Sequence, residues 1–223
     1  MKINEIITES SNTNLLIIDV QPEYAEGSFD TCARILPGVQ KMIEQCNGKV
    51  VVVYNDFGGG DSQHSVYQYL AGIDDFSSNG EEFDEETQMW VSARPKLSQH
   101  LQNATYLQKE FGFLRAYMDQ GVADGTMIEI MREMALRKVN DSRDIPFEEL
   151  PKWVQQDINN QLGGHNWDNE GISLQDYVPI HLLKRLSPFY MMGGGRNECL
   201  REIELVCNAF NIKYKRVDSL IYG

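Results

Sequence analysis

The segment Asn14-Leu-Leu-Ile-Ile-Asp19 indicates the fold class, because it is an uninterrupted apolar run that ends in an acid. Apolar runs of this length, without polar alternation, are typical of strands that are buried on both faces of a parallel sheet. We therefore predict a buried strand over residues 14–19, with the carboxylate of Asp19 at its carboxyl-terminal edge.

A helix and a second strand follow this segment. Val39, Met42, Ile43 and Cys46 have helical spacing, and Pro37 can stand in the first turn of that helix. The run from residue 49 to residue 54 contains four consecutive valines and predicts the second buried strand. A strand, a helix and a strand in this order predict a right-handed parallel unit.

The rest of the chain continues the alternation. We predict strands over 105–109, 188–192 and 213–217, helices over 125–138 and 200–210, and exposed loops over 55–61 and 74–86. On the last helix, Arg201, Glu202 and Glu204 are expected to face water. Segment 139–186, apart from a short helix near 151–161, reads as an irregular insertion that serves as a lid or an interface. These elements predict one α/β domain over residues 1–223 with a mainly parallel sheet.

Composition excludes several classes of function. The chain has 223 residues, of which 33 are acidic and 20 basic, giving a net charge of −13. Such a surface repels nucleic-acid phosphates and anionic lipids, so neither nucleic acid nor membrane is an expected partner. No apolar run approaches the roughly 20 residues of a membrane helix, and the first residues lack the apolar centre of a signal peptide, which predicts a cytoplasmic protein.

The four cysteines, Cys32, Cys46, Cys199 and Cys207, show no C-x-x-C spacing and are expected to be free thiols. Cys207 and Cys46 are expected to be buried on helix faces, whereas an exposed position is considered for Cys32. Cys199 differs from the others, since it follows Gly193-Gly-Gly and opens a helix, where the helix dipole favours the thiolate.

Three polar side chains follow or end predicted strands, namely Asp19, Lys109 and Cys199. Ligands of open parallel sheets bind beyond the carboxyl ends of the strands. A thiol nucleophile needs a base, and because all four histidines lie in loops or beside weak helices, a carboxylate is the better candidate. Each residue also has a purely structural interpretation: Cys199 as a small core residue, Asp19 as a cap, and Lys109 as a solvated lysine.

Three motifs resemble those of the isochorismatase-like cysteine hydrolases, the superfamily of nicotinamidases and N-carbamoylsarcosine amidohydrolases. The opening strand carries Asp19, followed two positions later by Gln21 and five later by Tyr24. The second motif is Leu107-Gln-Lys-Glu-Phe-Gly-Phe113, and the third is Gly193-Gly-Gly-Arg-Asn-Glu-Cys-Leu200. The resemblance covers roughly residues 13–138 and 187–222.

This resemblance implies a three-layer α/β/α sandwich around a sheet of about six strands. It implies a triad in which Asp19 takes the thiol proton, Lys109 stands beside it, and Cys199 attacks a carbonyl or amide carbon to give a thioester. The backbone N–H groups of Gly195 and Cys199 would form the oxyanion hole. The expected substrate-binding residues are Gln21, Tyr24, Asp56, Phe113 and Arg196.

Two departures from the family pattern affect the expected chemistry. Arg196 replaces a small residue three positions before the cysteine, where a cation could recognise an anionic substrate or block the pocket. In the loop after the second strand, Asp56 could match a metal-binding acid, but Gly58 stands where the first histidine belongs. We therefore expect no zinc, and no other cofactor.

Three functions remain open from the sequence. The first is a cysteine hydrolase acting on a small amide, ureido or related C–N compound. The second is a catalytically inactive member of the same fold, retained as a binding or host-interaction protein. The third is a nucleotide or phosphate binder that uses residues 193–195 at a helix N-terminus. A small-molecule substrate is the expected partner, a homo-oligomer is left open, and the first seven residues resemble those of some phage-encoded proteins.

Overall fold

The structure is a computed structural model that describes residues 13–24, 31–55, 62–73, 81–84, 89–92, 94–109, 123–136, 152, 156 and 180–223. Residues cluster into two compact units. The first contains residues 1–108, 188–200 and 214–223, and the second contains residues 109–187 and 201–213. The second unit thus includes segment 139–186, of which the structure describes only 152, 156 and 180–186.

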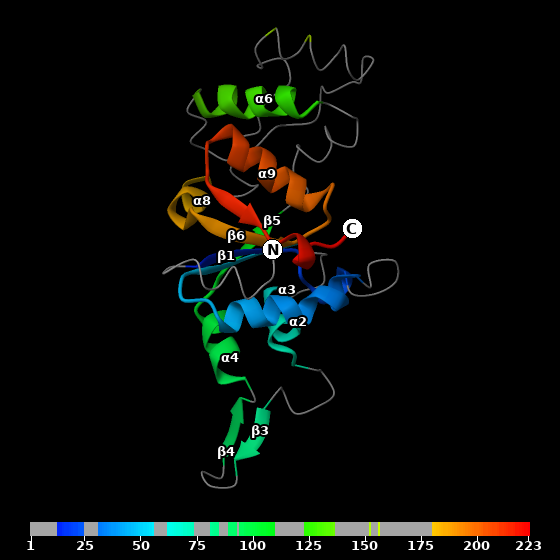
Figure 1. The fold of residues 1–223 in the computed structure, drawn as a ribbon, viewed down its shortest axis with the longest axis vertical. Coiled ribbons are helices and arrows are strands. Elements are labelled where there is room, and N and C mark those ends of the chain that lie inside the picture. The colour runs from blue at the N-terminus through cyan, green and yellow to red at the C-terminus, as the bar shows by residue number, and fades with distance from the viewer. Residues whose placement is uncertain are drawn as a thin grey trace. The chain divides into compact units, whose positions relative to one another are not determined.

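The described part of the chain forms a five-stranded parallel sheet with the order β5-β2-β1-β6-β7 (Figure 1). This result confirms the predicted α/β class and parallel sheet. Five strands are described where about six were expected, and beyond β7 the chain adds only an isolated bridge between Gly195 and Tyr222. The strands are β1 (Asn14–Ile18), β2 (Val50–Asn55), β5 (Thr105–Lys109), β6 (Phe189–Gly193) and β7 (Tyr214–Arg216).

Strand β1 is the centre of the sheet and is buried on both faces. Leu15 pairs in register with Val50 on one side and with Tyr190 on the other. Leu15 and Ile17 point to one face and Leu16 and Ile18 to the other, yet all four are fully buried. Burial on both faces explains why this strand, like β2, has an uninterrupted apolar sequence rather than an alternating one.

Helices α2 (Thr31–Glu44), α3 (Ser62–Ala71) and α4 (Pro95–Gln102) belong to the first unit and lie on one face of the sheet (Figure 1). Their apolar side chains form a core with those of β1, β2 and β6. Arg94 ties the helices together, since it donates from Nη1 to Oε1 of Gln40 (2.5 Å) and from Nε to Oε1 of Glu44 (2.8 Å). Gln40 in turn donates to the carbonyl of Leu70 in α3 (3.0 Å).

Helix α2 begins earlier than predicted. It starts at Thr31, so Pro37 lies inside the helix rather than in its first turn. Proline removes one intrahelical N–H, but the apolar face formed by Cys32, Ile35 and Val39 is buried in the core and outweighs this local loss.

One other expectation for the first unit was wrong, and two helices were missed. Segment 74–86 was expected to be a loop, but its residues 81–84 form β3 (Glu81–Asp84), which pairs with β4 (Met89–Ser92) as an antiparallel hairpin. Helices α3 and α4 were not predicted, because tyrosines and a glutamine separate the buried Val66 and Leu70 of α3, and α4 has only two leucines as apolar residues. Two short 3₁₀ turns, η1 (Pro22–Tyr24) and η5 (Asp218–Leu220), complete this unit.

The second unit contains helices α6 (Asp124–Leu136) and α8 (Ile180–Leu186) and most of α9 (Cys199–Ala209). Arg132 of α6 donates from Nε to the carbonyl of Ala209 (3.2 Å), and Arg201 forms an ion pair with Asp124. Helix α8 shows that segment 180–186 is helical, where an irregular insertion was expected. The helix predicted near 151–161 lies outside the described residues, except at 152 and 156.

Glu202 corrects a prediction for α9. It was expected to face water together with Arg201 and Glu204, but its exposed fraction is 2%. The carboxylate stands in the first turn of the helix, where the positive end of the helix dipole favours a negative charge.

Candidate functional site

The strand order reverses between β1 and β6. From β1 the chain proceeds through β2 to β5 on one side of the sheet, and from β6 to β7 on the other. The crevice beyond the carboxyl ends of two such strands is the usual ligand site of open parallel sheets. Asp19 follows β1, and Gly193-Gly194-Gly195 ends β6, so both motifs singled out from the sequence lie at this point.

Asp19 is fully buried and has a positive φ of 50°. Its N–H donates to the carbonyl of Val53 (2.8 Å), which extends the pairing of β1 with β2 by one residue. Left-handed backbone is uncommon for residues other than glycine, although aspartate tolerates it better than most. The chain therefore turns sharply at the residue that the sequence indicated as the catalytic acid.

Gly193 allows the two strand ends to approach closely. It has a φ of 80°, and a Cβ atom there would lie 2.2 Å from the carbonyl oxygen of Ile18 and 2.6 Å from Cγ2 of Val20. No side chain fits at that distance. Gly194, with a φ of 64°, continues the turn toward α9. The glycine run is thus required by the contact between β6 and the residues around Asp19.

Residues 195–198 form the turn that leads into Cys199. The N–H groups of Glu198 and Leu200 donate to the carbonyl of Gly195, at 3.0 and 3.2 Å, and the N–H of Arg196 donates to the carbonyl of Tyr222 (2.9 Å). None of the hydrogen bonds of the described residues uses the N–H of Gly195. Cys199 is the first residue of α9 and is 4% exposed. The turn therefore places a thiol at a helix N-terminus, as the sequence predicted.

Tyr222 is the residue of this site that the sequence analysis missed. Its hydroxyl donates to the backbone carbonyl of Asp19 (2.8 Å), and its ring centroid lies 6.1 Å from that of Tyr24. The bridge to Gly195 fixes its backbone beside the turn before Cys199. Tyr222 thus links the end of β1 with the turn after β6.

The surroundings of Tyr222 raise the pKa of its hydroxyl. Burial raises this pKa most, and the nearby groups of Asp19, Cys32 and Cys199 raise it further. The phenol stays neutral and remains a hydrogen-bond donor. The carboxyl group of Asp19 and the thiol of Cys199 consequently lie within electrostatic range of one buried phenol.

Cys32 is also part of this environment, where an exposed position had been considered. It is fully buried in the first turn of α2, and its Sγ lies 3.8 Å from the carbonyl oxygen of Gln21. Burial, with a smaller contribution from Asp19, raises the pKa of this thiol to about 11. Cys32 is therefore protonated at neutral pH, and it adds a second thiol near Asp19.

Gln21 has a structural partner rather than an open binding position. Its Nε2 donates to the carbonyl of Asn55 (3.1 Å), and its Oε1 accepts from the N–H of the same residue (3.0 Å). Nε2 also lies 3.0 Å from Oε2 of Glu23. The side chain therefore continues the sheet at the end of β2, which occupies both polar ends of the group that was expected to bind substrate.

Tyr24 and Arg196 lie at the rim of the same region. The hydroxyl of Tyr24 accepts a hydrogen bond from Nδ2 of Asn55 (2.6 Å). The Arg196 side chain is exposed, and its Nη1 lies 3.4 Å from Oδ1 of Asp218. Arg216 reaches the same carboxylate oxygen at 2.9 Å. Arg196 is therefore directed toward η5 by an exposed ion pair, which is worth little on its own.

Several predicted residues cannot be placed in the site. Lys109 is the last residue of β5, and its side chain lies outside the described residues. Asp56 and Phe113 also lie outside them. Within the described ranges, no group of three His, Cys, Asp or Glu side chains is arranged to hold a metal ion.

The remaining thiols are structural. Cys46 is buried with its Sγ 2.9 Å from the carbonyl oxygen of Thr13, and Cys207 is fully buried on α9. Burial raises the pKa of both, that of Cys207 to about 12. Both cysteines are buried as expected, but only Cys207 lies on a helix face, because α2 ends at Glu44, two residues before Cys46.

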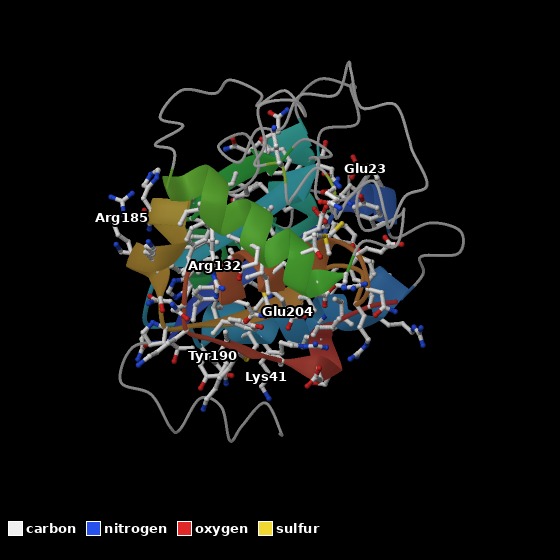
Figure 2. All side chains as sticks on the ribbon, turned by 90° about the horizontal axis from the view of Figure 1, so that it is seen from above. Glu23, Lys41, Arg132, Arg185, Tyr190 and Glu204 are labelled. Atoms are coloured by element: carbon white, nitrogen blue, oxygen red, sulfur yellow. The ribbon has the colours of Figure 1, made fainter. Side chains whose placement is uncertain are left out.

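Charged side chains such as Lys41 and Arg185 extend outward from the ribbon (Figure 2). Among the helices that the structure describes, none combines the length and the apolar character needed to cross a bilayer.

No family model, no curated protein and no solved structure matches this chain.

Proposed function

We propose that this protein is a divergent isochorismatase-like hydrolase that cleaves a C–N bond of a small amide or ureido compound. The observation that supports the proposal is that Asp19 and Cys199 both stand at the reversal point of a parallel sheet, each within electrostatic range of the buried Tyr222 phenol. Burial of both faces of β1 also supports the three-layer sandwich that this family implies.

In the proposed first step, Asp19 takes the proton of the Cys199 thiol and the thiolate attacks the amide carbon. A C–S bond forms, and the carbonyl electrons move to the oxygen. When they return, the C–N bond breaks, and the amine leaves with the proton that Asp19 holds. A nearby Lys109 ammonium group would favour both the thiolate and the carboxylate.

In the proposed second step, water hydrolyses the thioester. Asp19 takes a proton from the water, the hydroxide adds to the carbonyl carbon, and the C–S bond breaks to return the thiol and release the acid. The N–H groups of Gly195 and Cys199 would hold the oxyanion in both steps, a role consistent with the described hydrogen bonds, none of which uses the Gly195 N–H.

Two observations favour an inactive binding protein of the same fold. Cys199 is only 4% exposed, and the side chain of Gln21 is bound to the backbone of Asn55. Under this alternative, Asp19 and Cys199 are core residues around Tyr222, and the region does not admit a substrate.

The test combines ammonia release with labelling. The intact protein is incubated with a panel of small primary amides and ureido acids, and ammonia is measured by a coupled assay. The same measurement is made on Cys199→Ser, Asp19→Asn and the control Cys207→Ser, which changes a buried thiol of the same helix. We expect release by the native protein and the control, and a loss of about 10³-fold or more in the other two.

Failure of the hypothesis has a distinct result. If no compound is hydrolysed and Cys199 is alkylated no faster than Cys207 in the folded protein, the binding-protein alternative replaces the hydrolase.

A further inference from the structure

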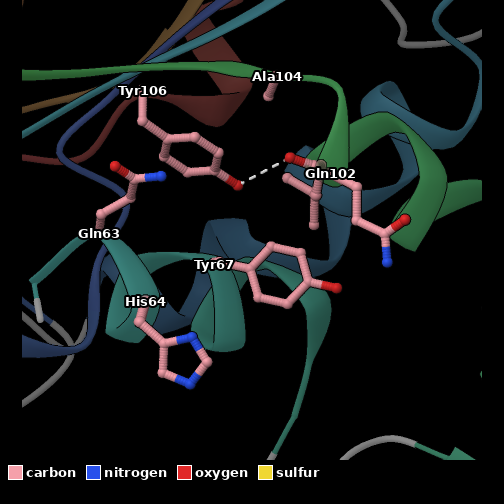
Figure 3. A pocket seen from close by; sticks show the side chains of 7 residues that line it. Gln63, His64, Tyr67, Gln102, Ala104 and Tyr106 are labelled. Carbon is pink, nitrogen blue, oxygen red and sulfur yellow. Dashed lines mark hydrogen bonds between the residues drawn. The ribbon is translucent and has the colours of Figure 1, made fainter.

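A cavity of about 420 Å³ lies where the start of α3, the end of α4 and the start of β5 meet (Figure 3). Its volume falls within the range of small-molecule sites, which is about 300–1,000 Å³. The lining contains none of Asp19, Cys199 and Tyr222, so the cavity is separate from the proposed hydrolytic site. The residues that define its chemistry are Gln63, His64, Tyr67, Leu101, Gln102 and Tyr106.

The described lining residues include Tyr67 and Tyr106, and none of them is an acid, a lysine or an arginine. Tyr67 and His64 are stacked, with ring centroids 6.5 Å apart and planes 20° from parallel. The hydroxyl of Tyr106 donates to the carbonyl of Leu101 (3.1 Å), which fixes the ring against the end of α4. Burial raises the pKa of Tyr106, so the ring stays neutral. These walls offer planar π-faces, with His64 as the one basic side chain among the described lining residues.

Two carboxamides complete the lining. Figure 3 shows Gln63 on one side of the hollow and Gln102 on the other, with the rings of Tyr67 and Tyr106 between them. An amide both donates and accepts hydrogen bonds, and can therefore pair with the mixed polar edge of a heterocycle. Among the described lining residues His64 is the one side chain that can become cationic, and an anionic ligand would also face a chain of net charge −13.

We propose that this cavity binds a neutral, planar nitrogen heterocycle, of the size and hydrogen-bonding pattern of a nucleobase. The ring stacks on Tyr67 and Tyr106, and Gln63 and Gln102 bond polar atoms at its opposite edges. Stacking on aromatic side chains tolerates any base, so the carboxamides provide what selectivity the site has.

Adenine is the probe for this proposal. Binding to the intact chain is measured by saturation-transfer NMR and by calorimetry. We expect a Kd of roughly 0.01–10 mM, the range for a ligand of this size. Cyclohexanecarboxamide is the comparison compound, because it is neutral and carries an amide but has no flat ring. We expect it to bind at least about fivefold more weakly than adenine.

Gln102→Leu is the decisive variant, and Gln99→Leu is its matched control, an exposed glutamine of the same helix outside the cavity. We expect Gln102→Leu to weaken adenine binding roughly threefold to tenfold, and Gln99→Leu to leave it within about twofold. Tyr67→Leu, checked for folding by circular dichroism, should weaken it at least about fivefold.

Three results would overturn the proposal. The first is no saturable binding of adenine at 20 mM, a concentration about twice the upper expected Kd. The second is equal adenine binding by the Gln102→Leu and Gln99→Leu variants, and the third is binding of cyclohexanecarboxamide as tight as that of adenine. None of them bears on the hydrolase hypothesis, which depends on Asp19 and Cys199.

Discussion

The hydroxyl of Tyr222 donates a hydrogen bond of 2.8 Å to the backbone carbonyl of Asp19, which lies 203 positions earlier in the chain. This bond is buried, and it holds the residue after the central strand to the turn that precedes Cys199. The geometry of the candidate site therefore depends on a side chain from the last segment of the sheet unit.

Removing this hydroxyl should destabilise the fold. We expect Tyr222→Phe to lower the free energy of unfolding by about 1–3 kcal/mol, because a buried carbonyl loses its partner. Urea denaturation measures the change. Tyr190→Phe is the control, since its ring is also buried and its hydroxyl makes no hydrogen bond among the described residues. Equal losses in the two variants would contradict the assigned role.

The glycine run gives a second prediction. In Gly193→Ala the new Cβ atom would meet the Ile18 carbonyl oxygen at 2.2 Å in a left-handed backbone, so we expect a loss of about 3 kcal/mol or more, or failure to fold. Gly125→Ala, in α6, meets nothing within 4 Å and should gain about 0.5–1 kcal/mol. Thermal denaturation distinguishes the two, and a stable Gly193→Ala protein would show that the strand ends are not so close.

Gln21 provides a test between scaffold and substrate binding. Gln21→Glu keeps the size of the side chain but replaces the Nε2 donor with an oxygen that faces the Asn55 carbonyl. We expect a loss of about 2–4 kcal/mol, measured by chemical denaturation without any ligand. If stability is unchanged and only ligand binding suffers, the role expected from the family resemblance is restored.

The buried thiols predict how stability depends on pH. Burial raises the pKa of Cys32 to about 11 and of Cys207 to about 12 in the folded protein. In the unfolded chain these thiols have a pKa of about 8.5 and ionise first as the pH rises. The contribution of the two thiols to the free energy of unfolding is therefore complete below about pH 8.5 and is lost as the pH rises toward the folded-state pKa values.

We therefore expect stability to fall between about pH 8.5 and pH 10.5, with the fall roughly 1–3 kcal/mol smaller in Cys207→Ala than in the native protein. Urea denaturation at both pH values measures it. Val206→Ala, a buried change on the same helix that does not titrate, should lower stability equally at both.

Thiol reactivity tests the site most directly. With limiting iodoacetamide at pH 8, a thiol of pKa about 11 is ionised in only about one molecule per thousand, so Cys32 should label slowly. Cys207 should be slower still. Cys199, at a helix N-terminus, is expected to label fastest in the folded chain, as read by mass spectrometry of the four cysteine peptides. A rate for Cys199 no greater than that of Cys207 would contradict the proposed nucleophile.

The centre of the sheet could be predicted from the sequence because β1, β2 and β6 are nearly continuous apolar runs. Residues 15–18 and 50–55 are buried on both faces, and a two-sided environment leaves a clear sequence pattern. Helix α3 has no clear sequence pattern. Of its central residues only Val66 and Leu70 are fully buried, and two tyrosines and a glutamine separate them. The start of α2 was misplaced because Pro37 resembled a first-turn proline.

Of the candidate site, only the residues that stand at or near the ends of strands could be predicted from the sequence. Asp19 and Cys199 stand at the ends of apolar runs, and parallel topology brings such ends to one edge. The roles of Tyr222 and Gln21 depend on contacts across 203 and 34 positions. Nothing in the local sequence of either residue identifies its partner, and the burial of Cys32 likewise follows from the true start of α2.

The central position of β1 has a consequence during synthesis. Its pairing partner β6 begins 80 residues after β5 ends, at Phe189 against Lys109. At the usual 5–20 residues per second, the ribosome needs roughly 4–16 s to make the intervening segment. For that time the nascent chain holds β1 with an unpaired edge of consecutive leucines and isoleucines, which makes this interval the period when chaperone binding or aggregation competes with completion of the sheet.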